Sequence, residues 1–219
     1  MARIVVIGGH GKVALRLADA LTGRGHAVRS TIRNEAHGAD VEDTGAVPYL
    51  LDIEGSDAED LAEVLRGADA VVFSAGAGAD GRADRKRTVD LEGSLKSIEA
   101  AGIAGIRRFV QVSAIGVDEP LPADTEPVWR AYVEAKRDAD AALRGSDLDW
   151  TIVRPGRLTD GPATDAVRIA ARIPEGGEVS RTDVAAVLAA VLEDESTIGA
   201  QFELVGGEQT VSEALASLR

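Results

Sequence analysis

The stretch that decides the fold occupies positions 3–14 and reads RIVVIGGHGKVA. Its first half is a run of apolar, mostly β-branched residues, which favours a buried strand. Its second half has the spacing Gly8-x-x-Gly11-x-x-Ala14, and a helical pattern follows. Gly8 permits a tight turn, Gly11 lets the backbone approach a pyrophosphate, and Ala14 lets the helix pack closely on the strand. We therefore predict an anion site at this helix N-terminus; the alternative is a turn that is only structural.

Short apolar runs recur along the first 155 residues and predict further strands. The runs are continuous, as expected of strands that are covered on both faces. The predicted strands are Arg3–Ile7, Ala27–Ile32, Val47–Leu51, Ala70–Phe73, Arg108–Val112 and Trp150–Val153. Because helical patterns separate them, we predict an α/β fold in which helices cover both faces of a doubly wound parallel sheet, in three α/β/α layers. Its ligand site should lie beyond the carboxyl ends of the strands, at the switch point.

Apolar stripes and glycines locate the intervening helices. The stripes comprise Val13, Leu17 and Leu21, then Leu61, Val64 and Leu65, then Val89, Leu91, Leu95 and Ile98. Glycines often follow the last residue of a helix, because they adopt the left-handed conformation at low cost. We therefore place helix C-termini at Gly23, Gly67 and Gly102.

The last third of the chain, residues 155–219, has a different character. Gly161-Pro162, Pro174 and Gly176-Gly177 predict loops. Between them we expect a helix at Val184–Leu192, a strand at Gln201–Val205 and a short helix at Val211–Leu218. This is too little for an independent substrate domain, so we predict one domain over residues 1–219 whose last part forms a small, loop-rich cap on the substrate side.

Composition excludes several classes of protein. The 219 residues carry a formal net charge of −13, which disfavours nucleic acid and anionic membranes as partners. There is no cysteine, so disulfides, thiolate nucleophiles and cysteine zinc sites are excluded. The three histidines lack metal-ligand spacing, and we predict no metal. The first apolar run is too short for an export signal, so we expect a cytoplasmic protein acting on a small molecule.

The residue after the second strand bears on which dinucleotide would bind. An acid there usually holds the ribose 2′-hydroxyl of NAD, but here the strand is followed by Arg33. A guanidinium suits a 2′-phosphate, and His10 and Lys12 in the glycine loop would add positive charge. We therefore favour NADP over NAD; the alternative is that Arg33 is a solvated strand-end residue. We also expect cofactor contacts from the neighbouring Val13.

The ends of the third and fourth strands supply further candidates. Asp52 and Ile53 follow the third strand, and the Asp52 carboxylate could accept a hydrogen bond from the adenine amino group or simply begin a turn. The fourth strand ends in small residues that would let the main chain touch the ribose: Ser74, Ala75 and Gly76. The alternative is a flexible loop.

A tyrosine and a lysine one helical turn apart are the candidate catalytic pair. Tyr132 and Lys136 lie on a predicted helix over 128–143, where a spacing of four places them on one face. A neighbouring ammonium lowers the pKa of a phenol and readies it for proton transfer. Ser113, which ends the fifth strand, would orient a substrate carbonyl. The structural alternatives are a partly exposed tyrosine and an ordinary turn serine.

Together these motifs resemble the atypical short-chain dehydrogenase/reductases. The segment 152–156, Ile-Val-Arg-Pro-Gly, adds to the resemblance, which covers nearly the whole chain. Within that group the small NAD(P)H-binding, NmrA-like proteins and the biliverdin/flavin reductases are most similar. The resemblance implies a Rossmann fold with NADP bound across the sheet, and Pro155 and Gly156 next to the nicotinamide.

The resemblance also implies catalytic roles. Tyr132 would be the general acid/base, Lys136 would bind the nicotinamide ribose and tune the tyrosine, and Ser113 would orient the carbonyl. Ala14 replaces the third glycine of the loop, and Asp90 stands where the family tetrad has an asparagine. An ionised carboxylate cannot donate a hydrogen bond as an amide does, so the water-linked proton relay is in doubt.

Three functions remain open. The first is an NADP(H)-dependent oxidoreductase that reduces a small carbonyl or planar conjugated compound. The second is an NmrA-like NADP(H) sensor with a protein partner and no turnover, and the third is a flavin- or tetrapyrrole-type reductase that needs no tyrosine. The short C-terminal part disfavours a nucleotide-sugar epimerase. We expect a monomer or homodimer.

Overall fold

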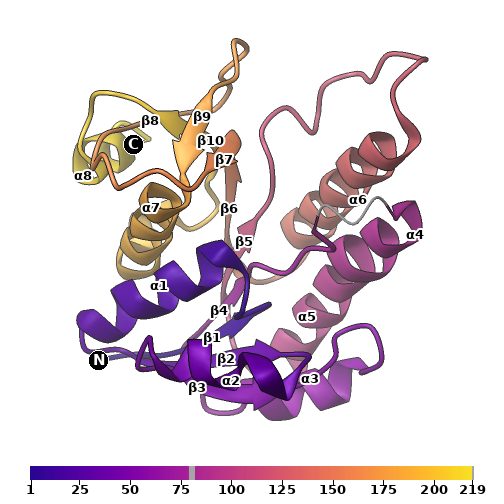
Figure 1. Ribbon diagram of the computed structural model, residues 1–219, viewed down its shortest axis with the longest axis vertical. Coiled ribbons are helices and arrows are strands. Elements are labelled where there is room, and N and C mark those ends of the chain that lie inside the picture. Colours follow the sequence, from indigo (N-terminus) through magenta and orange to yellow (C-terminus); the bar gives the residue numbers. More distant parts are fainter. Residues whose placement is uncertain (79–81, 219) are drawn as a thin grey trace.

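The computed structural model describes residues 1–78 and 82–218 and is shown in Figure 1. The strands are β1 (Arg3–Ile7), β2 (Ala27–Ile32), β3 (Val47–Leu50), β4 (Ala70–Phe73), β5 (Arg108–Val112), β6 (Asp149–Pro155), β7 (Arg157–Thr159), β8 (Val167–Ala170), β9 (Glu178–Ser180) and β10 (Gln201–Gly206). The α-helices are α1 (Lys12–Gly23), α2 (Gly38–Glu42), α3 (Ala58–Leu65), α4 (Ala83–Arg85), α5 (Glu92–Ile103), α6 (Pro127–Arg144), α7 (Arg181–Glu193) and α8 (Val211–Ala216). Short 3₁₀ segments form η1 (Glu35–His37) and η3 (Glu195–Thr197), and η2 (Lys86–Leu91) is π-helical.

The central sheet has the order β3-β2-β1-β4-β5-β6-β10-β8. All neighbouring pairs are parallel except β10 and β8, which are antiparallel. The chain moves outward from β1 to β3 and then returns to β4 on the other side of β1, which creates the switch point where such folds bind their ligands. The predicted doubly wound α/β fold is confirmed, and the six predicted strands of the first 155 residues are all present, with limits that differ by at most two residues.

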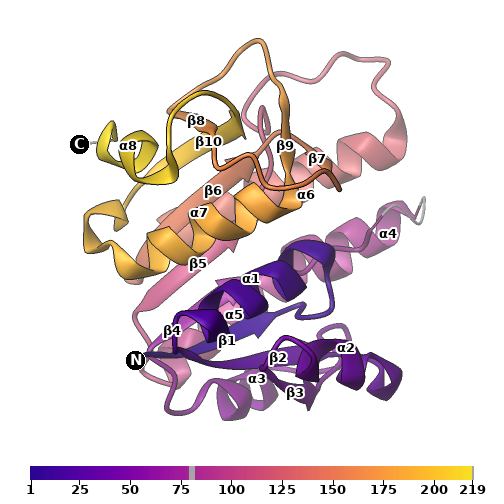
Figure 2. The same ribbon diagram turned by 60° about the vertical axis from the view of Figure 1, so that its left-hand side comes forward.

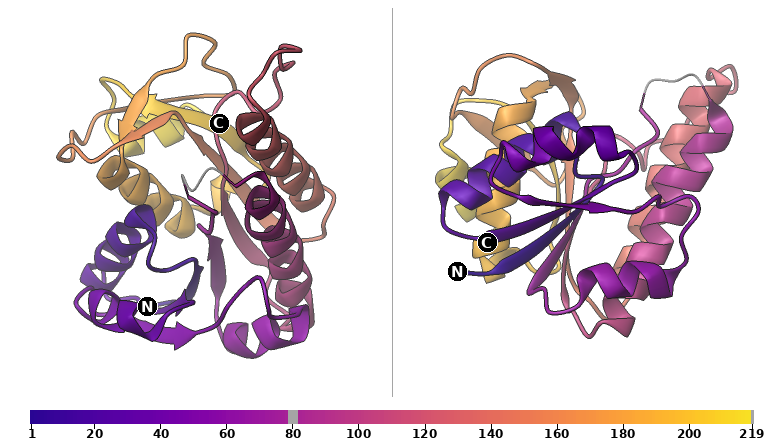
Figure 3. Two further views of the ribbon diagram at one scale, coloured as in Figure 1. Left: turned by 45° about the vertical axis from the view of Figure 1, so that its right-hand side comes forward. Right: turned by 60° about the horizontal axis from the view of Figure 1, so that its bottom comes forward.

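Helices cover both faces of the sheet, as Figures 2 and 3 show, and an apolar core lies beneath each layer of helices. Ile4 and Val6 of β1 point into the core beneath α1 and α7, whereas Val5 and Ile7 point into the core beneath α3 and α5. Side chains alternate across a strand, so a strand covered on both faces must be apolar at every position. This explains the continuous apolar run with which the chain begins.

The C-terminal third differs from the predicted loop-rich cap. β10 and β8 extend the central sheet, while β7 and β9 form a separate two-stranded parallel sheet. The predicted segments at 184–192, 201–205 and 211–218 correspond to α7, β10 and α8. Strand β8 was missed because it is short and alternates, with buried Val167 and Ile169 flanking exposed Arg168, as suits an edge strand. Residues 155–219 therefore add two strands to the central sheet, and β7 and β9 lie beside the carboxyl ends of its strands.

Strand β3 departs from the expected burial on both faces. It forms one edge of the sheet, and Val47 and Leu50 are 62% and 52% exposed. The third predicted helical stripe also departs from expectation, because Leu95 is exposed. The wide π-helical turn of η2 precedes α5, and small residues of α5 face the core instead: a Cβ on Gly93 would lie 2.9 Å from the side chain of Ile53.

The three glycines placed at helix C-termini lie there. Gly67 follows α3 with a φ of +73°. Gly23 is the last residue of α1 and Gly102 the last but one of α5, and the left-handed turns that follow these two helices fall at Gly25 and Gly105. Over the described residues 1–78 and 82–218, no helix combines the length and the apolar character needed to cross a membrane.

Candidate functional site

The glycine loop between β1 and α1 is held close to its neighbours. Gly8 has a φ of +82°, and a Cβ placed there would lie 2.6 Å from the Cα of Ala75 in the loop after β4. The Gly8 amide donates to the Thr31 hydroxyl at 3.0 Å, and the Gly9 amide donates to the Thr31 carbonyl at 2.8 Å. Both left-handed backbone and close packing therefore require glycine at position 8.

Helix α1 begins at this loop without a capping side chain. Its N-cap is Gly11, which offers no side-chain acceptor, and no acidic residue occurs in the first turn. Ala14 is completely buried, as expected for the position that packs against the strand. The first N–H groups of the helix are thus left for an anion, which the helix dipole favours.

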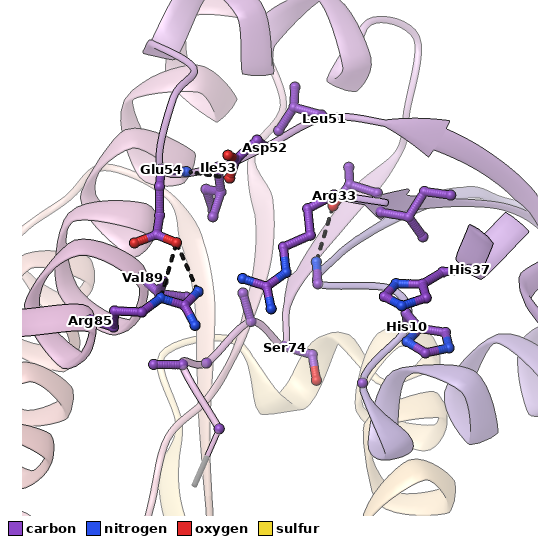
Figure 4. Close-up of a pocket in the computed structure, with 18 residues that line it drawn as sticks. His10, Arg33, His37, Leu51, Asp52, Ile53, Glu54, Ser74, Arg85 and Val89 are labelled. Carbon is purple, nitrogen blue, oxygen red and sulfur yellow. Dashed lines mark hydrogen bonds and ion pairs between the residues drawn. The ribbon is translucent and has the colours of Figure 1, made fainter. Parts of the chain in front are cut away.

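A cleft of about 300 Å³ opens where β1, β2, β3 and β4 end, and Figure 4 shows its lining. Nine predicted cofactor residues line it: Gly8, His10, Gly11, Arg33, Asp52, Ile53, Ser74, Ala75 and Gly76. Prediction missed Thr31, His37, Glu54, Arg85 and Val89. His37 and Glu54 lie shortly after β2 and β3, so their position relative to the strand ends was an available signal, whereas Arg85 and Val89 reach the cleft from α4 and η2 and had no such signal.

Arg33 extends into the cleft from the end of β2, as Figure 4 shows. Its side chain makes no hydrogen bond or ion pair with any residue in the described part of the chain. Across the cleft, Glu54 accepts hydrogen bonds from Arg85 at 2.8 Å and from the Thr88 hydroxyl at 2.6 Å. The Arg85 bond is the main reason that the pKa of Glu54 lies below its usual range, with a smaller contribution from the charge on Arg33.

Asp52 begins a turn and also lies in the lining of the cleft. Its Oδ1 accepts the Glu54 amide at 3.1 Å, so the residue does begin a turn. The side chain nevertheless lines the cleft. The expected bond to adenine stays a prediction.

Five predicted cofactor residues lie outside the lining of this cleft: Lys12, Val13, Lys136, Pro155 and Gly156. The Lys12 ammonium pairs with Asp160 at 2.7 Å, and Val13 is buried in the core beneath α1. Pro155 ends β6, where its carbonyl accepts the Ile115 amide at 3.0 Å. A Cβ on Gly156 would lie 2.3 Å from the Gly177 carbonyl, so close backbone packing explains this glycine.

Tyr132 and Lys136 lie on α6, which begins close to its predicted position. Pro127 occupies the first turn, and the Glu126 side chain accepts the Trp129 amide at 2.9 Å. The buried Lys136 ammonium lies 3.3 Å from Asp90 Oδ1 and donates to the Val112 carbonyl at 3.2 Å.

Asp90 connects the candidate catalytic pair to the cofactor cleft. Its Oδ2 accepts the Ala77 amide at 3.0 Å, and Ala77 lines the cleft. A carboxylate here serves as the counter-ion of Lys136, a role that an asparagine would not provide. Burial acts to lower the pKa of Lys136, but Asp90, Tyr132 and Asp140 together outweigh burial, and the net shift is upward.

The expected activation of the phenol needs correction. Burial raises the pKa of Tyr132, Lys136 opposes this only in part, and the charges of Asp90 and Asp140 add to the increase. The neighbouring ammonium therefore does not lower the phenol pKa overall, because burial above all, and the two carboxylates in addition, outweigh its effect. On the other side, the Lys86 ammonium lies 5.9 Å from the centre of the Tyr132 ring.

Ser113 belongs to a buried polar network centred on Asp140. The Asp140 carboxylate accepts the Ser113 hydroxyl at 2.7 Å, Gln111 Nε2 at 2.7 Å and Arg154 Nε at 2.9 Å. Arg154 also donates to Asp118 at 2.6 Å, and its charge holds the pKa of that carboxyl below its usual range. The proton of the Ser113 hydroxyl is therefore already donated to Asp140, which leaves the hydroxyl only lone pairs to offer.

The sequence held one signal for this network. Asp140 follows Lys136 by four residues, so the tyrosine, the lysine and the aspartate form one stripe along α6. Within the ranges 1–78 and 82–218, no three histidine or carboxylate side chains gather as metal ligands would.

The fold and the glycine loop define a dinucleotide-binding domain of the Rossmann type, and comparison with known proteins gives its family. The NAD(P)H-binding family model matches residues 8–195, so the chain belongs to that family. The chain is 38% identical to the "Uncharacterized sugar epimerase YhfK" of Bacillus subtilis, over 99% of this chain and all of that protein.

Two solved structures agree along nearly the whole chain. A "putative NAD-dependent epimerase/dehydratase" from Bacillus halodurans is 34% identical and superposes with a TM-score of 0.91, over 99% of this chain and all of the other. The "oxidoreductase ylbE" of Lactococcus lactis is 26% identical, with a TM-score of 0.87 over 99% and 96% of the two chains. The resemblance drawn from the sequence is thereby confirmed.

Proposed function

We propose that the protein is an NADP(H)-dependent reductase of a small carbonyl or planar conjugated compound. The observation that carries the cofactor preference is Arg33, a guanidinium that extends into the cleft at the end of β2 with no internal partner among the described residues. NAD-binding members of such folds place an acid there for the 2′-hydroxyl. A forked cation instead matches the geometry and charge of a 2′-phosphate.

The residues of the cleft suit the adenosine half of the dinucleotide. The N–H groups at the start of α1 would bind the pyrophosphate, which is why Gly11 must approach without a side chain. Asp52 would accept from the adenine amino group, with Ile53 and Val89 on the apolar faces of the base. The backbone of Ser74–Gly76 would lie against the ribose.

The residues of α6 suit the nicotinamide half. When bound, the reduced dinucleotide supplies a hydride to the substrate. Tyr132 would donate the matching proton to the substrate oxygen, since a raised pKa keeps the phenol protonated at neutral pH. Lys136, held by Asp90, would bind the nicotinamide ribose and stabilise the phenolate that forms. Ser113 would act only as an acceptor unless Asp140 releases it.

A second candidate is a flavin- or tetrapyrrole-type reductase that does not use Tyr132. Two observations favour it: the phenol pKa is raised, and the Ser113 hydroxyl is bound to Asp140. A conjugated acceptor that takes a hydride at carbon and a proton from solvent needs neither side chain.

The first experiment is calorimetric titration of the full chain with NADPH and NADH. We expect tighter binding of NADPH, and failure to bind either at millimolar concentration would overturn the proposal. NADPH oxidation is then followed with carbonyl compounds, flavins, biliverdin and a UDP-hexose, the last because two relatives carry epimerase in their names.

Tyr132→Phe separates the two candidates, with Tyr49→Phe as the control because Tyr49 lies on the edge strand β3. Loss of turnover with NADPH affinity retained supports proton donation by Tyr132. Turnover retained in both variants supports the second candidate. Tight NADPH binding without oxidation of any compound would favour a sensor.

A further inference from the structure

Two histidines that are distant in sequence stack at one side of the cleft. The rings of His10, in the glycine loop, and His37, in η1, have centres 3.6 Å apart and planes inclined by 8°. Both residues line the cleft, as does Arg33. Figure 4 shows the two rings face to face, with the Arg33 side chain extending into the cleft beside them. Three potential cations therefore gather where β1 and β2 end.

One carboxylate contacts the stacked pair directly. Asp40 of α2 lies 2.7 Å from His10 Nε2. From α1, the Lys12 ammonium is turned to Asp160, and Glu35 at the start of η1 is exposed. The opposite wall carries Asp52 and Glu54, of which Glu54 is engaged by Arg85.

This arrangement makes the positive charge of the group formed by His10, His37 and Arg33 depend on pH. Imidazole gains its proton between about pH 8 and pH 5. Two protonated rings face to face repel each other, and Asp40 compensates only one charge. A further anion placed against the pair would compensate the second and favour its protonation. Because such linkage is reciprocal, protonation of the pair must strengthen binding of that anion by the same factor.

We propose that His10 and His37 form a titratable specificity element beside Arg33, which increases the preference for a 2′-phosphorylated dinucleotide over an unphosphorylated one as the pH falls. The inference rests on the proposed binding of a dinucleotide in this cleft. Arg33 would supply a constant charge and the histidines a variable one. The preference for NADPH over NADH is then a property of three residues, of which prediction from the sequence found two.

The test measures the ratio of the dissociation constants of NADH and NADPH at about pH 8 and about pH 6. The wild-type protein is compared with His37→Phe, which keeps a flat ring for stacking but cannot take a proton. The phosphate of NADPH also gains a proton in this range, but that change is common to both proteins. The difference between them therefore isolates the histidines.

For each protein, the change in this ratio from about pH 8 to about pH 6 is calculated. We expect the change towards NADPH to be roughly tenfold larger in the wild type than in His37→Phe, which is the size of one charge-assisted contact. His37→Gln should behave like His37→Phe. The control is His26→Gln, because His26 pairs with Glu193 away from the cleft, and it should behave like the wild type.

Identical pH dependence in the wild type and both His37 variants overturns the inference and leaves the proposed function intact. If neither dinucleotide binds to folded protein at either pH, the inference and the proposed function fail together. Thermal unfolding of each variant verifies that it is folded.

Discussion

The two ends of the candidate site differ in burial and in the pairing of their charges. At the adenosine end, the glycine loop presents bare backbone, and Arg33 extends into an open cleft without an internal partner among the described residues. At the nicotinamide end, nearly every charge is already compensated, because Lys136 is paired with Asp90 and Arg154 with Asp140. The first end is an open cleft with an exposed cation, whereas the second is a buried polar network whose charges are paired.

This difference shows where binding and where chemistry would be controlled. An exposed cation can be replaced with little effect on the fold, so the adenosine end can set cofactor preference independently. A buried ion pair stabilises only while both partners remain, and removal of one leaves an uncompensated charge. Replacement of the exposed Arg33 should therefore change affinity more than stability, and replacement of a buried ion-pair partner should change stability more than affinity.

The largest effect is expected from Asp140→Ala. Arg154 would lose its buried partner, and Ser113 and Gln111 would lose their acceptor, so the free energy of unfolding should fall by about 3–5 kcal/mol. Urea denaturation measures this. Asp138→Ala on the exposed face of the same helix is the control and should change stability by less than about 0.5 kcal/mol. Equal, small effects would show that the nicotinamide end is not a rigid polar core.

Gly8→Ala should be next in size and should affect both stability and binding. Left-handed backbone costs a residue with a Cβ about 1–2 kcal/mol, and the contact with Ala75 adds a packing cost, for a total of about 3 kcal/mol. Gly25 has the same φ of +82° with open space around it, so Gly25→Ala isolates the backbone cost. NADPH binding should be lost only in Gly8→Ala, and its retention there would contradict the proposed role of the loop.

Arg33→Ala should change affinity without changing stability. We expect the dissociation constant of NADPH to rise by about 10–100-fold, as for a lost charge-assisted contact, and that of NADH to change by less than about twofold. Titration calorimetry measures both constants. Arg24→Ala, at the other end of α1, is the control. Equal losses for the two dinucleotides would refute the assignment of the 2′-phosphate site.

The smallest effect concerns Glu54 at the cleft wall. Its pKa is lowered in the folded protein, chiefly by the bond from Arg85, so it stabilises the fold above its ordinary value of 4.5. This contribution is lost as the pH falls below that value and the carboxylate gains a proton. Glu54→Gln should therefore flatten the decline in stability below about pH 4.5, by no more than about 1 kcal/mol. Acid unfolding curves that coincide for the two proteins would exclude this role.

Prediction from the sequence succeeded where the responsible pattern is local. The strand at Arg3–Ile7, the turn at Gly8 and the helix that carries Tyr132 and Lys136 each depend on neighbours within a few positions. Residues after the strand ends were also found, because parallel strands bring their carboxyl ends to one edge. The same reasoning failed for the C-terminal strands, since the short β8 is defined by pairing with β10 and not by its own composition.

The sequence by itself therefore determined the order of most elements, the glycine turn after β1 and the family, because apolar periodicity and glycine spacing act over short distances along the chain. Only the tertiary structure decided which charges meet. The pairs Lys136–Asp90, Arg154–Asp140 and His10–His37 join segments that packing alone brings together. Electrostatic interactions depend on separation in space and on burial, so the raised phenol pKa of Tyr132 followed chiefly from its burial, with the charges of Asp90 and Asp140 adding to it, and not from the spacing of the motif.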